Sequence, residues 1–335
     1  MLIIRNDAVG DLVVTTPILS FLAEVAPLAQ VDVLASPTNS SLIAGDNRVH
    51  HCYVSPDTRS GWMGLLRELR SRRYDVIYSL RYGRALREGL ISGFAATRAT
   101  QKVSVFRPKR YHGLFTQIVR TPRKATHMAE HLLYVVGASL DLQADSGEAS
   151  LQRYPMHLAI GSEAEAVVEE FLTRRGVGDF VVVNFSARER ERDWPPASCA
   201  RVIRELARRH AGLTFVLTAP AVRSDEAASI VAACQGVRVV VFPPSSDLLV
   251  LAALIRRSRL VVTPDTAAVH IAAATHRPVL GLYLKLRTQL WVPYRVPSRL
   301  VQAAPGAPIA AIPESAIVDA FEELHGETTA AAPSR

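Results

Sequence analysis

The chain has 335 residues, of which 49% are apolar, and it carries a formal net charge of +8. Such a length accommodates two domains of about 150 residues, and the basic balance favours anionic partners, unless it reflects only an arginine-rich composition. The three cysteines, Cys52, Cys199 and Cys234, are isolated and lack CxxC spacing, which argues against a disulfide framework and a structural zinc site and favours a reducing cytoplasm.

In the first half of the chain, short apolar runs alternate with segments of helical periodicity. The apolar residues 1–5 predict a strand, and the N-terminus lacks the basic segment and apolar core of a signal peptide. Further strands are predicted at 30–36 and 74–80, and helices at 15–25, 61–73 and 129–140, with more helix within 84–135. Pro17 is expected in the first turn of its helix, where a proline is tolerated. No apolar run reaches the ~20 residues that a membrane span needs.

The second half shows the same alternation more regularly. Strands are predicted at 180–185, 213–218, 237–242, 259–263 and 279–283, and helices at 196–210, 224–234, 247–257 and 266–275. Short apolar strands separated by helices indicate parallel sheets that are covered on both faces. We therefore expect an α/β protein with two Rossmann-like domains whose parallel sheets face a central cleft. The domains are predicted at 1–150 and 151–325, with a disordered tail at 326–335.

In open parallel sheets, ligands bind beyond the carboxyl ends of the strands. The loop after the first strand contains Gly10, which allows a tight turn, and Asp11, at or just before a helix start. From this loop alone, Asp11 is more simply a helix N-cap, but a carboxylate held there by first-turn amides could also act as a general base. The single glycine does not make the GxGxxG fingerprint of a dinucleotide-binding loop.

The loop at 184–196 joins a small polar residue to a run of alternating charges. Ser186 follows a buried strand, and the first arginines of the run alternate with acidic residues in a way typical of a solvated surface. Arg192 lies beside Trp194-Pro195, where a helix begins. It is therefore the arginine best placed to bind a phosphate, which a helix N-terminus already favours.

A third loop begins where an apolar run meets Asp265 and Thr266. Asp265 could cap the following helix, and Thr266 together with the amides of Ala267 and Ala268 would form an anion site. His270 lies four positions after Thr266, on the same helical face. Taken alone, His270 is more simply a structural histidine. With two other strand-end loops of matching chemistry, the pattern favours a binding site.

Together these residues resemble glycosyltransferase family nine, whose best-known members are the ADP-heptose:lipopolysaccharide heptosyltransferases. The resemblance consists of Gly10-Asp11 followed by TTP, Trp194-Pro195 after a basic loop, and Asp-Thr-x-x-x-His at 265–270 followed by AAATHRPVLGLY. The segment 127–141 is also similar to a helix of that family. Order and spacing agree over nearly the whole chain.

The resemblance implies a GT-B architecture, with the acceptor held mainly by the first domain and the nucleotide-sugar by the second. It implies inverting transfer of a heptose or related sugar, without a metal or cofactor, from ADP-heptose as co-substrate to a hydroxyl of a lipopolysaccharide-core-type acceptor. Asp11 would be the general base, and Ser186 and Arg192 would contact the donor phosphates. The donor pocket would be lined by Asp265, Thr266, Ala267 and His270.

The chain departs from the family pattern at two of these positions. Arg192 stands where the family usually has lysine, and Ala267 where it usually has glycine, so the donor pose and donor sugar stay open. Asp225 or Glu226 is a further donor-binding candidate, and the sequence does not choose between them. The alternatives are a transferase that uses another nucleotide-sugar or a soluble acceptor, and a nucleotide-dependent oxidoreductase, which the missing GxGxxG disfavours.

Charge suggests where such an enzyme works. The basic segments 67–73 and 107–112 could attract anionic lipid, which would place the protein in the cytoplasm, at the inner face of the membrane. Nucleic acid is disfavoured as a partner because the basic residues are not interleaved with aromatic ones and no nucleic-acid-binding motif is present.

Overall fold

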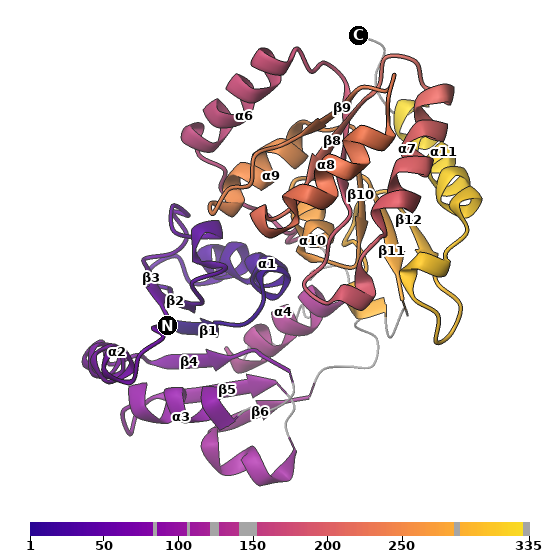
Figure 1. Cartoon of the computed structure of the whole chain (residues 1–335). Coiled ribbons are helices and arrows are strands. Elements are labelled where there is room, and N and C mark those ends of the chain that lie inside the picture. Colours follow the sequence, from indigo (N-terminus) through magenta and orange to yellow (C-terminus); the bar gives the residue numbers. More distant parts are fainter. Residues whose placement is uncertain (83–85, 106–107, 121–126, 141–152, 285–288, 331–335) are drawn as a thin grey trace. The chain divides into compact units, whose positions relative to one another are not determined.

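The computed structural model describes the chain except for residues 83–85, 106–107, 121–126, 141–152, 285–288 and 331–335 (Figure 1). It divides into two compact units, Met1–Ala159 (unit 1) and Ile160–Arg335 (unit 2). Each unit is an α/β structure built on a six-stranded parallel sheet. The predicted boundary after residue 150 lies outside the described residues. The segment that follows still belongs to unit 1, because the His157 amide donates to Thr16 Oγ1 at 3.1 Å.

The sheet of unit 1 has the strand order β3-β2-β1-β4-β5-β6. Its strands are β1 (Leu2–Arg5), β2 (Asp32–Ala35), β3 (His51–Val54), β4 (Val76–Ser79), β5 (Gln101–Val105) and β6 (Gln117–Val119). The three predicted strands are the three central ones, β2, β1 and β4. Only helices and a basic loop at 107–113 were expected within 84–135, and β5 and β6 correct this. They are short strands toward one side of the sheet, with polar residues among the apolar ones.

Helices cover both faces of this sheet. The helices are α1 (Val9–Val25), α2 (Arg59–Ser71), α3 (Leu86–Ala95) and α4 (Met128–Ser139), with 3₁₀ turns η1 (Ser40–Leu42) and η2 (Lys109–Leu114). On one face, Leu69 of α2 and Ile91 of α3 pack against Leu2, Ile4 and Ile77 of the strands. The α1 and α4 helices contact each other, and α4 lies on the other face.

Helix α1 begins earlier than predicted, so its first turn contains residues that were expected in the preceding loop. Its N-cap is Ala8, so Gly10 is a helical residue rather than a turn residue, and Asp11 lies in the first turn. Pro17 is inside the helix rather than in its first turn. A proline leaves the carbonyl four residues earlier without its amide donor. Here Thr16 Oγ1 donates to that carbonyl, Val13 O, at 2.7 Å, so the break is locally repaired.

The sheet of unit 2 has the order β12-β11-β10-β7-β8-β9. The strands are β7 (Phe180–Asn184), β8 (Thr214–Thr218), β9 (Val239–Val241), β10 (Val261–Pro264), β11 (Val279–Tyr283) and β12 (Ser298–Gln302). The helices are α6 (Ser162–Arg175), α7 (Pro196–Arg209), α8 (Ser224–Ala233), α9 (Leu248–Arg257), α10 (Ala267–Ala274) and α11 (Glu314–Ala330), with 3₁₀ turns η3 (Arg190–Arg192), η4 (Ala221–Arg223), η5 (Gln289–Trp291) and η6 (Ile309–Ala311). All five predicted strands and four predicted helices are present, while β12, α6 and α11 were not predicted.

Helix α11 corrects the expectation of a disordered tail from residue 326. The helix continues to Ala330, and only 331–335 lie outside the described residues. Arg299 on β12 explains the extension, because it pairs with Glu323 at 2.8 Å and also with Glu327. The small polar composition of the tail hid this anchoring, since its partner lies on another element.

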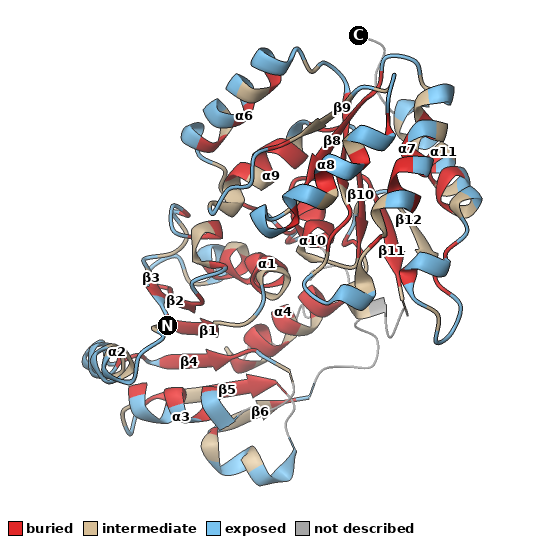
Figure 2. Cartoon of the chain, in the orientation of Figure 1, coloured by how far each residue is buried: buried red, intermediate tan, exposed pale blue. Residues whose placement is uncertain are grey.

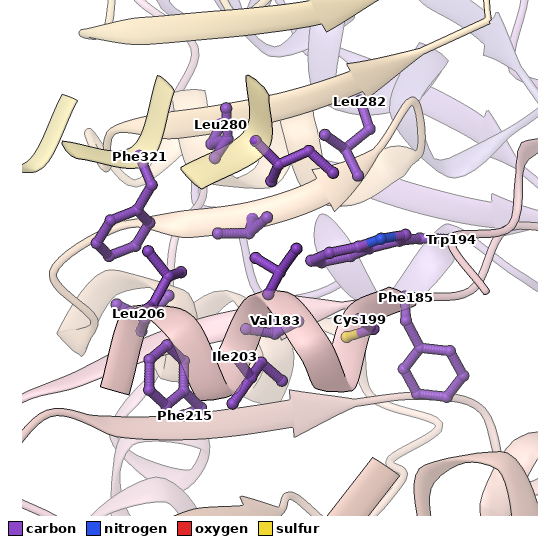
Figure 3. Packing of buried hydrophobic residues seen from close by; sticks show 14 of the residues in the cluster. Val183, Phe185, Trp194, Cys199, Ile203, Leu206, Phe215, Leu280, Leu282 and Phe321 are labelled. Carbon is purple, nitrogen blue, oxygen red and sulfur yellow. The ribbon is translucent and has the colours of Figure 1, made fainter. Parts of the chain in front are cut away.

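The core of unit 2 fixes the loop that follows β7 (Figure 3). Trp194 is 1% exposed and packs with Val183, Cys199 and Leu282. Its indole Nε1 donates to Ser198 Oγ at 3.2 Å. Pro195 is the N-cap residue of α7, as the sequence predicts. The loop between β7 and α7 is therefore held at its far end by a buried tryptophan.

In each sheet, the order in which successive strands are added changes direction at one point. In unit 1 this switch point lies between β1 and β4, and in unit 2 between β7 and β10. Open α/β sheets bind their ligands just beyond the strand ends at such a point. The loops that carry most of the predicted site residues follow β1, β7 and β10, so each begins at a switch point, whereas the candidates Asp225 and Glu226 follow β8. Among the described residues, no helix is long and apolar enough to cross a membrane.

Candidate active site

A buried arginine organises the switch point of unit 1. Arg5 ends β1, and its side chain is 2% exposed. Its Nη2 donates to Asp11 Oδ1 at 3.1 Å and to the Asp11 backbone oxygen at 2.5 Å. Its Nη1 lies 3.1 Å from Asp7 Oδ2 and donates to Leu80 O, just after β4, at 3.2 Å. Arg5 thereby joins the two strand ends of the switch point.

This arrangement leaves Asp11 accessible and oriented. Its side chain is 27% exposed, and Arg5 contacts only one of its carboxylate oxygens. The other oxygen, Oδ2, has no partner among the residues that the structure describes. The N-cap interpretation is wrong, because Ala8 occupies that position. Arg5 orients the carboxylate, where first-turn amides had been expected to do so.

Asp7 is a second carboxyl group at this switch point, and the sequence analysis did not single it out. Its side chain is 8% exposed, and its Oδ1 is buried without a hydrogen-bond partner among the described residues. Burial raises the pKa of Asp7. The positive charge of Arg5 lowers this pKa, and the negative charge of Asp11 raises it further. The signal for this cluster was an arginine in an otherwise apolar strand, LIIR, because such a residue needs buried partners.

At the switch point of unit 2, polar side chains join the ends of β7 and β10. Asn184 Nδ2 donates to Thr263 Oγ1 at 3.0 Å and to Thr266 Oγ1 at 3.2 Å. Thr266 is the N-cap of α10, and its hydroxyl accepts from the Ala268 amide at 3.3 Å. The suggestion that Asp265 caps this helix is therefore wrong. Asn184 was missed because its partners come from a strand far along the chain.

The side chain of Asp265 instead meets Arg192. Arg192 Nη1 lies 3.4 Å from Asp265 Oδ2, and its Nε lies 3.0 Å from Glu189 Oε2. Burial raises the pKa of Asp265, and the charge of Arg192 works against that rise. Arg192 is 38% exposed, so an anion from solvent can reach its guanidinium. The structure thus brings together Arg192, Asp265 and Thr266, which the sequence predicted as one site.

The remaining predicted residues differ in their surroundings. Ser186 is buried just after β7, and Ala267 is half-buried in the first turn of α10. His270 is 5% exposed, and its ring meets the Trp291 ring edge-on with centroids 5.9 Å apart. Burial lowers the pKa of His270 to about 4. His270 is thus packed against Trp291, and its Nδ1 is buried without a hydrogen-bond partner among the described residues.

Of the two acidic candidates at the start of α8, only Glu226 is bound to other side chains of unit 2. Asp225 is exposed. Glu226 pairs with Arg190 at 3.3 Å and with Arg223. Arg223 in turn pairs with Asp193, whose Oδ1 accepts from the Ala187 amide at 2.8 Å. Glu226 therefore helps to hold the loop between β7 and α7 in place.

Solved structures with this fold include family 9 glycosyltransferases. A family 9 glycosyltransferase from Veillonella parvula has a TM-score of 0.83 at 18% identity and covers 97% of each chain. The E. coli heptosyltransferase WaaC with ADP has a TM-score of 0.71 at 19% identity and covers 96% of this chain and 99% of that one. These likenesses, with the two Rossmann-like units, define the fold as GT-B.

The family follows from the sequence itself. The profile of Glycosyltransferase family 9 (heptosyltransferase) matches residues 62–308, and the chain belongs to this family. It is a glycosyltransferase. Lipopolysaccharide heptosyltransferase 3 of E. coli is 26% identical over 85% of this chain and 83% of its own length. The lipopolysaccharide core heptosyltransferase OpsX of Haemophilus influenzae is 22% identical over 84% and 78%.

Proposed function

We propose that this enzyme transfers a heptose from ADP-heptose to a hydroxyl of a lipopolysaccharide-core-type acceptor, with inversion and without a metal ion. The names of its relatives support the sugar and the acceptor. The observation that carries the proposal is the group at the start of α10. There an arginine, a carboxylate and a helix N-terminus lie together at a switch point, which is the chemistry that a sugar diphosphate requires.

In this proposal, unit 2 holds the donor. Arg192 and the first amides of α10 bind the diphosphate, and the Asp265 carboxylate accepts hydrogen bonds from sugar hydroxyls. When the diphosphate departs, it takes the electron pair of the anomeric C–O bond and gains negative charge. Arg192 and the helix dipole stabilise that charge. Ser186 and Ala267 line the same donor site. Compared with the glycine usual in the family, the methyl group of Ala267 narrows the approach to the phosphates.

Unit 1 supplies the base. The acceptor oxygen forms the new bond to the anomeric carbon from the face opposite the leaving diphosphate, so a single displacement inverts the configuration. The proton of the acceptor hydroxyl goes to the free oxygen of Asp11. Arg5 keeps Asp11 in one orientation through the other oxygen and the backbone carbonyl. Arg5 is thus a positioning residue for the base.

The acceptor also bears on location. We place the enzyme in the cytoplasm, at the inner face of the membrane, where a lipid-linked acceptor would be met. The basic segments 67–73 and 107–112 support this by their charge, since juxtamembrane cations attract anionic lipid. Arg107 lies outside the described residues, while Lys109 and Arg110 are exposed on η2.

Thermal denaturation of the enzyme with a panel of nucleotide-sugars tests the donor. A ligand that binds only the folded state raises the melting temperature, so ADP-linked sugars should raise it most, and EDTA should leave both the shift and the transfer unchanged. A larger shift with UDP- or GDP-linked sugars would instead favour the family member with another donor. Family membership removes the oxidoreductase alternative.

A further inference from the structure

One helix of unit 1 presents apolar side chains to solvent. Leu86, Leu90 and Phe94 on α3 are 54%, 47% and 59% exposed. They are four residues apart, so they lie along one side of the helix. The other exposed residues of α3 are Arg87 and Gly93. We call these five residues the α3 face.

The packing of α3 prevents this face from turning inward. On the opposite side, Ile91 and Ala95 belong to the core cluster under the sheet. A Cβ on Gly89 would lie 2.5 Å from the Leu114 side chain, so η2 packs closely there. The acidic residue of the helix, Glu88, is 1% exposed and pairs with Arg81 at 3.1 Å. Figure 2 shows α3 with a buried and an exposed side.

Basic side chains surround the apolar ones. The Arg87 guanidinium lies 4.9 Å from the centre of the Trp62 ring on α2. Arg70 donates to Phe94 O at 3.2 Å and to Ala96 O at 2.9 Å, so it lies at the C-terminal end of α3. On the neighbouring elements, exposed cations include Arg67 on α2 and Lys109 and Arg110 on η2, and Met63 on α2 adds another exposed apolar side chain. One acid, Glu68 on α2, is exposed beside Arg67.

We propose that the α3 face docks on an anionic phospholipid bilayer. Leu86, Leu90 and Phe94 enter the boundary between headgroups and acyl chains, and the arginines bind the lipid phosphates. A helix lying in the interface has this composition: an apolar side, flanking cations and no exposed acid. Basic charge alone would hold the protein near the surface, whereas a row of exposed apolar side chains can also be buried at the boundary of the acyl chains.

The position of α3 suits a lipid-linked acceptor, and in this respect the inference rests on the proposed function. The chain passes from β4 toward α3 through Leu80, whose carbonyl accepts from Arg5. Arg5 also holds Asp11. The α3 face therefore starts from the same edge of the sheet that carries the proposed base, so docking would bring the membrane surface to that edge.

Vesicle flotation tests the proposal. The full chain is mixed with vesicles of phosphatidylcholine, with or without phosphatidylglycerol, and the bound fraction gives a partition coefficient. We expect binding to the anionic vesicles that weakens with added salt. In the triple variant Leu86→Gln, Leu90→Gln and Phe94→Gln, the partition coefficient should fall at least about tenfold, because three apolar insertions are lost. The matched control is Leu28→Gln, which changes a leucine of unit 1 that is 97% exposed and should bind like the wild type.

Two results would overturn the docking surface. One is that the triple variant and the wild type have equal partition coefficients, while their circular dichroism spectra show that both are folded. The other is that the wild type binds no vesicles. If the wild type is then a dimer and the triple variant a monomer by light scattering, a second copy of the chain covers the face. Transfer to a soluble acceptor fragment should be unchanged in the triple variant, so failure of docking and failure of the proposed transferase activity are separate outcomes.

Discussion

Asp11 keeps one carboxylate oxygen free because Arg5 binds the other oxygen and the backbone carbonyl. The change Asp11→Asn keeps the size and the hydrogen bond to Arg5 through the amide oxygen, but it removes the proton acceptor. We expect kcat to fall by about two to four orders of magnitude, a range typical for loss of a general base, with donor binding largely intact. Initial rates and ADP titration measure the two effects. Unchanged turnover would remove Asp11 from the mechanism, and Asp57→Asn, at an exposed aspartate of the same unit, is the control.

Arg192 is the residue on which the proposed phosphate site depends. Its partners in this structure are the carboxylates of Glu189 and Asp265, and a diphosphate would replace them with a stronger anion. We expect Arg192→Ala to weaken ADP binding by about 10- to 100-fold, the cost of one charge-assisted hydrogen-bond partner. Calorimetric titration with ADP measures this directly.

The neighbouring residue Arg188 provides the control for this prediction. It is exposed in the same loop, so Arg188→Ala should bind ADP like the wild type if the effect depends on position and not on net charge. Arg192→Lys should recover part of the affinity, because lysine keeps the charge without the planar fork. Equal losses in the Arg188 and Arg192 variants would indicate a nonspecific electrostatic effect.

At the scale of the element, the first turn of α10 has a structural role as a capped helix start and a proposed role in donor binding. Thr266→Ala removes the N-cap, which should lower the free energy of unfolding by about 1 kcal/mol. It also disconnects Asn184 from the helix start, so ADP binding should weaken as well. Chemical denaturation and ADP titration separate the two effects.

A second threonine cap makes the comparison sharp. Thr58 caps α2 in unit 1 by accepting from the Gly61 amide at 3.1 Å. Thr58→Ala should cost a similar free energy of unfolding and leave ADP binding unchanged. If both variants weaken ADP binding equally, the effect of Thr266 is one of stability alone, and its place in the donor site is refuted.

The buried histidine of α10 gives the enzyme a pH-dependent stability. Burial lowers the pKa of His270 to about 4 in the folded protein, whereas in the unfolded chain it is about 6.5. Between these values the unfolded state binds a proton that the folded state does not. Stability from this group is therefore complete above about pH 6.5 and is lost as the pH falls toward 4, by about 3 kcal/mol in all.

The variant His270→Gln isolates this contribution from those of other groups. Unfolding in urea at pH 7.0, 5.5 and 4.5 should show that the wild type loses stability on acidification faster than the variant does. Carboxyl groups such as Asp7 and Asp265, whose raised pKa values act in the opposite direction, are common to both proteins and cancel in the difference. Parallel pH curves would show that His270 protonates freely in the folded state.

The strands that the sequence revealed are mainly those in the middle of each sheet, and the exception is the edge strand β9, which is itself an apolar run. Strands such as β1 and β7 are buried on both faces, so they are continuous apolar runs. The strands β3 and β12 lie at the edges, where His51 and Gln302 are exposed, and they carry no such signal. A central strand and the residues after it can therefore be predicted, whereas an edge strand depends on the neighbour that covers it.

The same distinction explains which site residues were found. Asp11, Asp265 and Thr266 directly follow predictable strands. Arg5 was missed because its role comes from contacts across the sheet, such as the one with a carbonyl 75 residues away. Likewise the choice of Thr266 over Asp265 as the cap depends on backbone angles and on Asn184, which spacing along the chain does not specify.

At the scale of the whole molecule, the two units follow one plan and divide the chemistry. Each has six parallel strands and a switch point between the strand that comes first in its sequence and a later one. Unit 1 has the proposed base and the α3 face at its strand ends, and unit 2 has the proposed donor group. The hydrogen bonds and ion pairs described for each group join residues of the same unit. Each half of the proposed site is therefore assembled without the other unit's side chains.

This division predicts that unit 2, produced alone as residues 160–335, folds and binds ADP. It has its own core around Trp194 and Phe321, and the segment just before residue 160 is bonded to unit 1 through His157 and Thr16, so the cut leaves this segment with the unit to which it is bonded. We expect a cooperative thermal transition and an ADP affinity within about tenfold of the full chain, since the phosphate contacts supply most of the binding energy. Transfer should be absent, because Asp11 is missing. A folded unit 2 that fails to bind ADP would show that the donor site needs residues of unit 1, and Arg192→Ala in the isolated unit provides the negative control for specific binding.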